Sequence, residues 1–108
     1  DEADALRMLT ALQGREHSVC TGVTVGRGDT LLTRSEETLV RFLPATEQRL
    51  RRYIESGEPM DKAGAYGIQG RGALLARGID GDYFNVVGLP VCLLGQMLLR
   101  FGVDPLLI

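Results

Sequence analysis

The opening segment of the chain carries apolar residues at the spacing of one helix face. The apolar positions i, i+3, i+4 and i+7 are Ala5, Met8, Leu9 and Leu12. Acidic residues lead this segment and Gly14 follows it, which is the order typical of a helix start and a helix end. The pattern therefore predicts an amphipathic helix from about Glu2 to Gln13.

Strict alternation of apolar and polar residues replaces this spacing between His17 and Val25. One face of the predicted strand carries Val19, Thr21, Val23 and Val25, and the other carries Cys20, Gly22 and Thr24. Gly26 to Asp29 supplies turn residues and Thr30 to Phe42 returns to β-type composition, so we predict an antiparallel hairpin. On its second strand we expect Thr38, Val40 and Phe42 on one face and Glu37, Leu39 and Arg41 on the other.

Helical spacing returns after Pro44. Thr46 is the predicted N-cap of a short helix that Gly57 ends, with Leu50, Tyr53 and Ile54 as its apolar stripe. Ala73 to Ile79 is predicted to form a third strand, and Asp80 to Asp82 its turn. Pro90 is expected to be the first residue of a last helix, whose inward residues are Leu93, Leu94, Met97, Leu98 and Phe101.

These elements, in the order helix, hairpin, helix, strand and helix, predict a mixed α/β layered fold. A length of 108 residues fits one domain. Hydrophobic residues make up 44% and charged residues 24%, near the globular average, which excludes disordered and fibrous classes. The most apolar stretch, Val86 to Leu94, is well short of the ~18 residues that a membrane span requires.

The formal net charge is −2, so bulk charge attracts neither nucleic acid nor anionic lipid. We therefore expect no nucleic-acid or membrane partner, and any anionic ligand needs a local cluster of donors. Arg49, Arg51 and Arg52 on the short helix are interpreted as a solvated face, with an anion site as the alternative, because Glu47 and Glu55 flank them.

The two cysteines, Cys20 and Cys92, are too few and too far apart for a disulfide framework or a CxxC metal site. Two buried thiols in a reducing cytosol are the expected arrangement, and the cytoplasm the expected location. The chain begins on Asp1 without a methionine, in a segment typical of a first helical turn. We interpret it as an incomplete chain.

The segment from Gly57 to Gly70, GEPMDKAGAYGIQG, combines two carboxylates, one lysine, a glutamine and four glycines. Glycines let backbone amides approach a phosphate, lysine adds a positive charge, and carboxylates can hold a divalent cation. The combination suits a nucleotide, although it matches neither a Walker A loop nor a Rossmann fingerprint. The alternative is a glycine-rich turn in which Asp61 and Lys62 pair with neighbours.

Other residues that could carry chemistry have ordinary structural explanations. His17 is the only histidine and has no second ligand nearby in sequence, so a hydrogen-bonded or half-exposed imidazole is expected. No serine lies in a GxSxG elbow. Glu36 and Glu37 interrupt an apolar strand; they are interpreted as an edge-strand guard, or as a metal or water ligand if they face the same cleft as Lys62.

The Gly57 to Gly70 segment resembles the signature of the Maf family, also called septum-formation inhibitor Maf-like proteins. Further matching blocks follow the family order over nearly the whole chain. These blocks are Gly14 to Val19, Thr21 to Val23, Glu37 to Phe42, Tyr53 with Ile54, and Gly81 to Pro90. So many ordered blocks make coincidence a poor explanation.

The resemblance implies a nucleoside triphosphate pyrophosphatase, which cleaves between the α- and β-phosphates with a divalent metal, Mg²⁺ or Mn²⁺. The implied role is the removal of non-canonical or excess nucleotides. The implied fold is an elongated mixed sheet flanked by helices, similar to inosine triphosphate pyrophosphatases. Thr21 and Gln69 resemble the branch that prefers dTTP, UTP and modified pyrimidine triphosphates.

One departure from the family pattern bears on activity. Members of ordinary length have about 190 residues, near the upper end of the single-domain range. They begin with a strand and a Ser-x-Ser-Pro-Arg-Arg loop, followed by an Ala-Asp-Thr segment with the presumed catalytic aspartate and a Gly-Lys-Pro segment. None of these occurs here. The resemblance therefore implies that residues 1–108 are the C-terminal portion of a single Maf-like domain, inactive by itself.

The resemblance also suggests roles for single residues. Lys62 is expected to neutralise phosphate charge, and Asp61 and Glu37 to support the metal or the attacking water. Substrate contacts are expected from Gln69, Thr21, Glu58, Gly64 and Gly70, with a turn or capping role as the alternative for Glu58. A different functional class stays open: a non-catalytic dimerisation or partner-binding module linked to inhibition of septum formation, with the homodimer as its partner state and the last helix partly uncovered.

Overall fold

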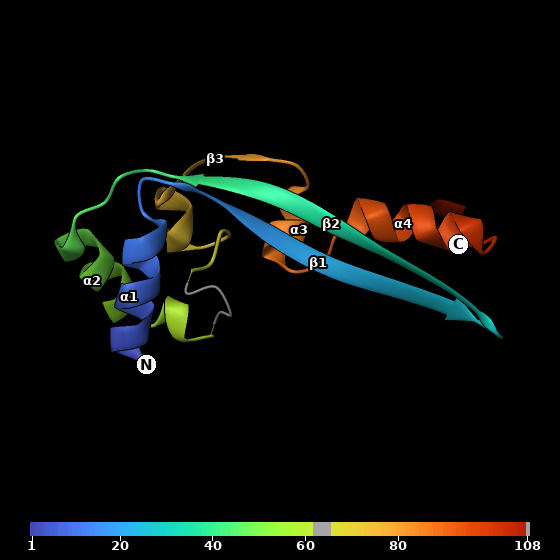
Figure 1. Cartoon of the computed structure of the whole chain (residues 1–108), viewed down its shortest axis with the longest axis horizontal. Helices are drawn as coiled ribbons and strands as arrows, with labels where there is room; N and C mark the ends of the chain where they lie inside the picture. The colour runs from blue at the N-terminus through green and yellow to red at the C-terminus, as the bar shows by residue number, and fades with distance from the viewer. Residues whose placement is uncertain (62–65, 108) are drawn as a thin grey trace. The chain divides into compact units, whose positions relative to one another are not determined.

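The computed structural model describes residues 1–61 and 66–107, without the side chains of residues 60 and 61. Its elements confirm the predicted mixed α/β class (Figure 1). They are α1 (Glu2–Leu12), β1 (Glu16–Arg27), β2 (Thr30–Phe42), α2 (Glu47–Glu55), η1 (Glu58–Asp61), η2 (Arg71–Leu74), β3 (Ala76–Asp80), α3 (Tyr83–Val87), α4 (Val91–Arg100) and η3 (Pro105–Leu107). None of the helices in these ranges is both long and apolar enough to span a bilayer.

The sheet has the strand order β1-β2-β3. β1 and β2 are the predicted hairpin, and Gly28 takes a φ of 60° in the short turn between them. β2 and β3 pair antiparallel, with Leu39 opposite Asp80 and Val40 opposite Ile79. The chain divides into two compact units: unit 1 holds residues 1–17 and 39–80, and unit 2 holds residues 18–38 and 81–108.

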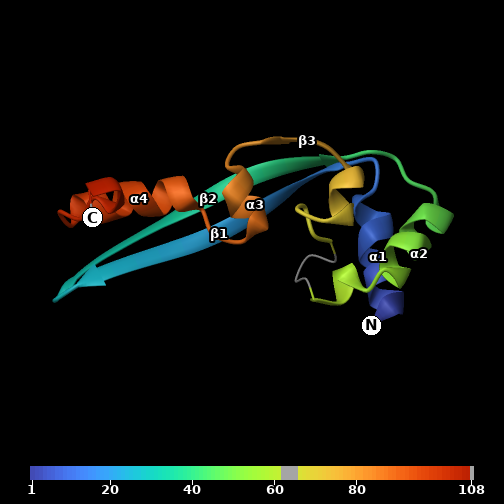
Figure 2. The same ribbon diagram turned by 180° about the vertical axis from the view of Figure 1, so that it is seen from behind.

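Unit 1 is built on two helices that pack against each other, α1 and α2 (Figures 1 and 2). Asp1 caps α1, since its carboxylate accepts from the Asp4 amide at 2.8 Å. Thr46 caps α2 as predicted, accepting from the Arg49 amide at 3.2 Å. The predicted face of α2 is buried at Leu50, Tyr53 and Ile54, and that of α1 is buried at Ala5 and Leu9 but half-buried at Met8 and Leu12. Val40 and Phe42 of β2 complete this core.

The third strand is shorter than predicted, because it begins at Ala76 and not at Ala73. The preceding residues form η2, in which the Leu75 amide donates to the Gly72 carbonyl at 3.0 Å. Apolar composition alone does not separate a strand from such a turn. Here the turn prevails because a carboxylate from elsewhere in unit 1 accepts its first amides, as described below.

Unit 2 contains most of the hairpin together with α3, α4 and η3. The predicted alternation along β1 is confirmed, with Val19, Thr21, Val23 and Val25 half-buried and their neighbours exposed. The predicted face of β2 is confirmed by Thr38, which is fully buried. Helix α3 was not predicted. It is short, and Asp82 caps it by accepting from the Phe84 amide at 2.8 Å.

The last helix is less buried than its sequence predicts. Pro90 is its N-cap, and Met97 is buried at 2% exposure. Leu93, Leu94, Leu98 and Phe101 are half-buried. Leu106 and Leu107, in η3, are 92% and 83% exposed. The last helix therefore leaves apolar surface uncovered within unit 2.

Both cysteines are exposed, which corrects the expectation of two buried thiols. Cys20 lies on the polar face of β1, where the thiol approaches the Glu37 carboxylate at 3.7 Å. The alternation of β1 places every even-numbered residue from 16 to 24 on the exposed face, and Cys20 is one of them. Strand register, and not the general preference of cysteine for the interior, determines its exposure.

Candidate functional site

The Glu58 carboxylate organises the backbone of the glycine-rich segment in unit 1. Its Oε1 accepts from the Tyr53 hydroxyl at 2.7 Å and from the Gly72 amide at 3.1 Å, and its Oε2 accepts from the Arg71 amide at 3.0 Å. The Tyr53 hydroxyl in turn accepts from the Gly67 amide at 2.8 Å. One buried phenol and one half-buried carboxylate thus fix three amides of this segment.

Two glycines allow the close approach on which this arrangement depends. A Cβ at Gly70 would overlap the Glu58 carboxylate. A Cβ at Gly72 would overlap the Gly67 carbonyl and lie 2.9 Å from the Tyr53 hydroxyl. These glycines therefore serve backbone packing around Glu58, which matches the turn role considered for that residue.

An aromatic cluster holds Tyr66, which directly precedes Gly67 in the same segment. His17 Nε2 shares a 2.7 Å hydrogen bond with the Tyr66 hydroxyl. The rings of His17, Tyr66 and Phe42 meet edge to face, with centroids 4.8 to 5.6 Å apart. Burial lowers the pKa of His17 and raises the pKa of Tyr66, so both are neutral near pH 7. His17 is therefore the half-buried, hydrogen-bonded imidazole that the sequence predicts.

Glu37 lies in unit 2 on the exposed face of β2. Its carboxylate accepts from the Ser18 hydroxyl at 3.3 Å and approaches the Cys20 thiol. The pKa of Cys20 is raised by desolvation and by the nearby Glu37 charge, so the thiol is protonated near neutral pH. The carboxylate is open to solvent and can accept further ligands.

The remaining predicted site residues are distributed over both units. In unit 2, Thr21 is half-buried on β1. In unit 1, Gln69 is exposed and its neighbour Gly70 lies against Glu58. Asp61 ends η1, but its side chain is outside the description, and Lys62 and Gly64 lie outside the described residues. The structure thus brings Glu58 and Gly70 together and leaves the assigned roles of the other residues as predictions.

The described side chains do not assemble a metal centre by themselves. Across residues 1–61 and 66–107, no three histidine, cysteine, aspartate or glutamate side chains are grouped as ligands for one ion. Glu37 supplies one hard oxygen donor of the kind that Mg²⁺ prefers, beside a hydroxyl and a thiol. Because the described side chains include Glu37 but not that of Asp61, we derive no chemical step through a metal.

Sequence reasoning missed the hydrogen-bonding roles of Tyr53 and Tyr66, which hold the segment in unit 1, and of Asn85 in unit 2. In unit 2, the Asn85 amide is buried at 1% exposure and donates to the carbonyls of Val19 and Glu36 and to the Thr38 hydroxyl. Tyr53 was predicted as an apolar helix residue and as part of a family block, without a hydrogen-bonding role. A tyrosine in an apolar stripe is itself a signal, because a buried phenol usually has a hydrogen-bond partner.

Comparison of the amino-acid sequence with known proteins identifies a family. A family model described as "Maf-like protein" matches residues 1–101. A Symbiobacterium thermophilum protein named "dTTP/UTP pyrophosphatase" is 57% identical over 102 residues, covering 94% of this chain and 53% of the relative. Proteins with the same name from Bacillus pumilus and Moorella thermoacetica are 50% and 54% identical over 105 residues each, covering 97% and 94% of this chain and 56% and 54% of the relatives.

The chain spans about half the length of the curated relatives it matches. The family match itself covers nearly all of the chain, and the glycine-rich segment with its Glu58 and Tyr53 anchors lies inside it. The identity extends over both compact units, since the aligned stretches cover more than nine-tenths of the residues. The chain therefore belongs to the Maf family of proteins.

Proposed function

We propose that this chain is part of a nucleoside triphosphate pyrophosphatase that converts dTTP and UTP to the monophosphate and pyrophosphate. The observation that carries the proposal is the name "dTTP/UTP pyrophosphatase" of relatives 50% to 57% identical over almost the entire chain. The biological role is removal of excess or modified pyrimidine nucleotides. The cytoplasm, which holds the nucleotide pool, is the proposed location.

The anchored segment in unit 1 supports this proposal. Before residues 62–65, Glu58 is held by the Tyr53 hydroxyl; after them, Tyr66 is held by His17 and the Gly67 amide by Tyr53. Lys62, the only lysine of the chain, lies between these anchors in sequence. Catalytic groups work best when rigid neighbours fix the chain that carries them.

Each predicted site residue has a role in the proposal. Lys62 neutralises charge on the triphosphate, and Asp61 and Glu37 position the attacking water or a divalent cation, Mg²⁺ or Mn²⁺. Gln69 and Thr21 contact the base or ribose. Gly64 and Gly70 are proposed to let backbone amides of the segment approach phosphate, and Glu58 serves substrate binding by holding the turn that follows the segment.

The reaction is tested by identifying the products. The assay uses the 108-residue chain and, in parallel, a completed protein that joins it to the segments of the Symbiobacterium thermophilum relative that it does not cover. With UTP, Mg²⁺ and ¹⁸O-labelled water, we expect UMP and pyrophosphate from the completed protein, and no turnover after EDTA treatment. Release of inorganic phosphate with UDP would contradict cleavage between the α- and β-phosphates.

A second candidate function is a dimerisation or partner-binding module acting in septum formation. The observation in its favour is the exposed apolar end of unit 2, where Leu106 and Leu107 are 92% and 83% exposed. Gel filtration with light scattering distinguishes the candidates. A stable homodimer that dissociates on Leu106→Asp, in a completed protein without pyrophosphate release, would favour the module over the enzyme.

A further inference from the structure

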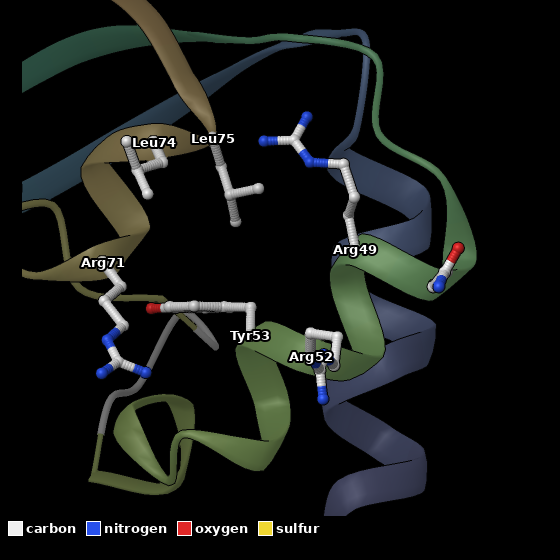
Figure 3. Close-up of a pocket in the computed structure, with 7 residues that line it drawn as sticks. Arg49, Arg52, Tyr53, Arg71, Leu74 and Leu75 are labelled. Atoms are coloured by element: carbon white, nitrogen blue, oxygen red, sulfur yellow. The ribbon is translucent and has the colours of Figure 1, made fainter.

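A pocket in unit 1 lies outside the segment assigned to the proposed reaction (Figure 3). It has a volume of about 360 Å³, within the range of small-molecule sites. Helix α2 and the η2–β3 region form its walls, which are lined by Gln48, Arg49, Arg52, Tyr53, Arg71, Leu74 and Leu75. The sequence suggested a solvated arginine face here, with an anion site as the alternative. The fold brings Arg71, Tyr53 and two leucines beside Arg49 and Arg52 of that face.

Among the described residues, the lining of this pocket is positive and includes no carboxylate. Neither Arg49 nor Arg71 forms a side-chain ion pair with any residue in the described part of the chain. Arg52 lies 3.8 Å from Glu55, with both side chains more than half exposed, so this pair is weak. A second pocket has a volume of about 460 Å³, and its lining includes two glutamates and one arginine. Its described lining therefore has no excess of positive charge.

The apolar part of the pocket lies beside the charges. Leu74 is 70% exposed here, and Leu75 and the Tyr53 ring complete the surface. In Figure 3 the Arg49 guanidinium points toward Leu75 on one side of the Tyr53 ring, and Arg52 and Arg71 lie on the other side. Guanidinium groups bind phosphate through paired hydrogen bonds, and tyrosine and leucine side chains favour a flat ring.

We propose that this pocket binds a small phosphate-bearing molecule with a flat ring, of the nucleoside monophosphate class. The ring lies against Leu74, Leu75 and Tyr53, and the phosphate takes the arginines as counter-charges. A ligand that has only the ring or only the phosphate makes only one of these two sets of contacts. The pocket is argued from its lining alone, without turnover or residues 62–65, and only the choice of UMP as the probe rests on the proposed function.

The pocket shares two residues with the Glu58 arrangement. The Tyr53 ring lines the pocket while its hydroxyl donates to Glu58, and the Arg71 side chain lines it while its amide donates to the same carboxylate. A bound ligand contacts η2 and α2 together. Occupancy should therefore slow hydrogen exchange at the amides of Arg71 and Gly72.

Binding is measured on the 108-residue chain and on the completed protein, with UMP as the probe and uridine and inorganic phosphate as its two halves. We expect UMP to shift the NMR resonances of Leu74 and Leu75 with a Kd of about 1 mM or tighter. Uridine and phosphate should each bind at least about tenfold more weakly. Affinity should fall as salt is raised.

Arginine variants locate the site. Arg49→Ala and Arg71→Ala should each weaken UMP binding by about tenfold. Arg51→Ala is the matched control, because Arg51 lies on the same helix, pairs with Glu47 and does not line this pocket. Circular dichroism of each variant checks that the fold is retained, and Arg49→Lys tests for planar recognition, since it keeps the charge and should still lose affinity.

Several results would overturn the inference. They are shifts confined to Gln69 and its neighbours, equal losses with Arg51→Ala, or binding by the 108-residue chain that disappears in the completed protein. The last result would mean that other segments of the protein occupy the pocket. Pyrophosphate release with no UMP shift at Leu74 would leave the proposed function intact and remove only this site.

Discussion

The Tyr53 hydroxyl donates to Glu58 Oε1 at 2.7 Å and, on the same oxygen, accepts from the Gly67 amide at 2.8 Å. Burial raises the pKa of Tyr53, and the hydrogen bond to Glu58 raises it further, so the phenol stays protonated at any physiological pH. The hydroxyl therefore connects α2 to both sides of residues 62–65. This connection gives the glycine-rich segment a defined backbone at its two ends.

Replacing Tyr53 with phenylalanine should destabilise unit 1. The change keeps the ring but leaves the buried Gly67 amide without its acceptor and removes a donor to Glu58. We expect a loss of about 2 kcal/mol in the free energy of unfolding, measured by urea denaturation. Tyr83→Phe is the control, because Tyr83 is 39% exposed. Equal stability of the two variants would show that the connection contributes nothing.

Gly72→Ala should destabilise unit 1 by more than the addition of one methyl group usually does. The added methyl overlaps the Gly67 carbonyl and crowds the Tyr53 hydroxyl, so the backbone must shift. A loss of about 2 kcal/mol or more is expected in the same denaturation experiment. Gly95→Ala offers the matched control, since its methyl meets nothing within 4 Å and alanine favours a helix. A Gly72→Ala variant as stable as Gly95→Ala would refute the close packing described here.

The stability of the chain should depend on the protonation of His17. Burial lowers the pKa of His17 in the folded state below its ordinary value of 6.5, so the unfolded chain binds the proton more readily. The contribution of this group to stability is therefore present above pH 6.5 and is lost as the pH falls toward the lowered folded-state pKa.

His17→Gln removes the titration and keeps hydrogen-bonding groups near Tyr66. Unfolding free energies are compared at about pH 7.5 and about pH 5. The difference between the two pH values should be smaller in the variant than in the original chain, whatever the absolute stability of the variant. An identical difference in both proteins would exclude His17 as the source of this pH dependence.

Asn85 should contribute to the stability of unit 2 through buried hydrogen bonds, as Tyr53 does in unit 1. Its amide nitrogen donates to Val19 and Glu36 carbonyls and to the Thr38 hydroxyl from a site with 1% exposure. Asn85→Ala leaves buried acceptors unpaired and should cost about 2–3 kcal/mol. Gln96→Ala, at an exposed position of α4, should cost much less. Comparable losses would mean that the Asn85 contacts are not stabilising.

Local patterns were sufficient to predict most elements of the fold. Helix spacing and caps placed α1 and α2, and alternation placed the hairpin with its buried Thr38 and Val40. Helix α3 was missed because its few residues carry too little periodicity, and its cap depends on Asp82 in a turn. The start of β3 was wrong because Glu58, distant in sequence, accepts the first amides of η2, the turn that takes up the first residues of the predicted strand.

Less of the candidate site than of the fold could be predicted from the sequence. The glycine-rich segment was identified by composition, and its family by ordered motifs, but composition cannot show which side chain holds which amide. The Glu58 network and the His17 to Tyr66 bond join residues up to 49 positions apart. The Arg49 and Arg71 pocket likewise requires α2 and η2 to meet. Such contacts are products of the tertiary fold.

The most direct test of the central proposal is the rate of pyrophosphate release from UTP by the completed protein and its Lys62→Met variant. Arg51→Ala serves as a charge-matched surface control, and circular dichroism verifies that all three proteins fold. The account predicts release by the unmodified protein and by Arg51→Ala, with a loss of about 100-fold or more for Lys62→Met. Undiminished release by Lys62→Met, or no release by the folded unmodified protein, would contradict it.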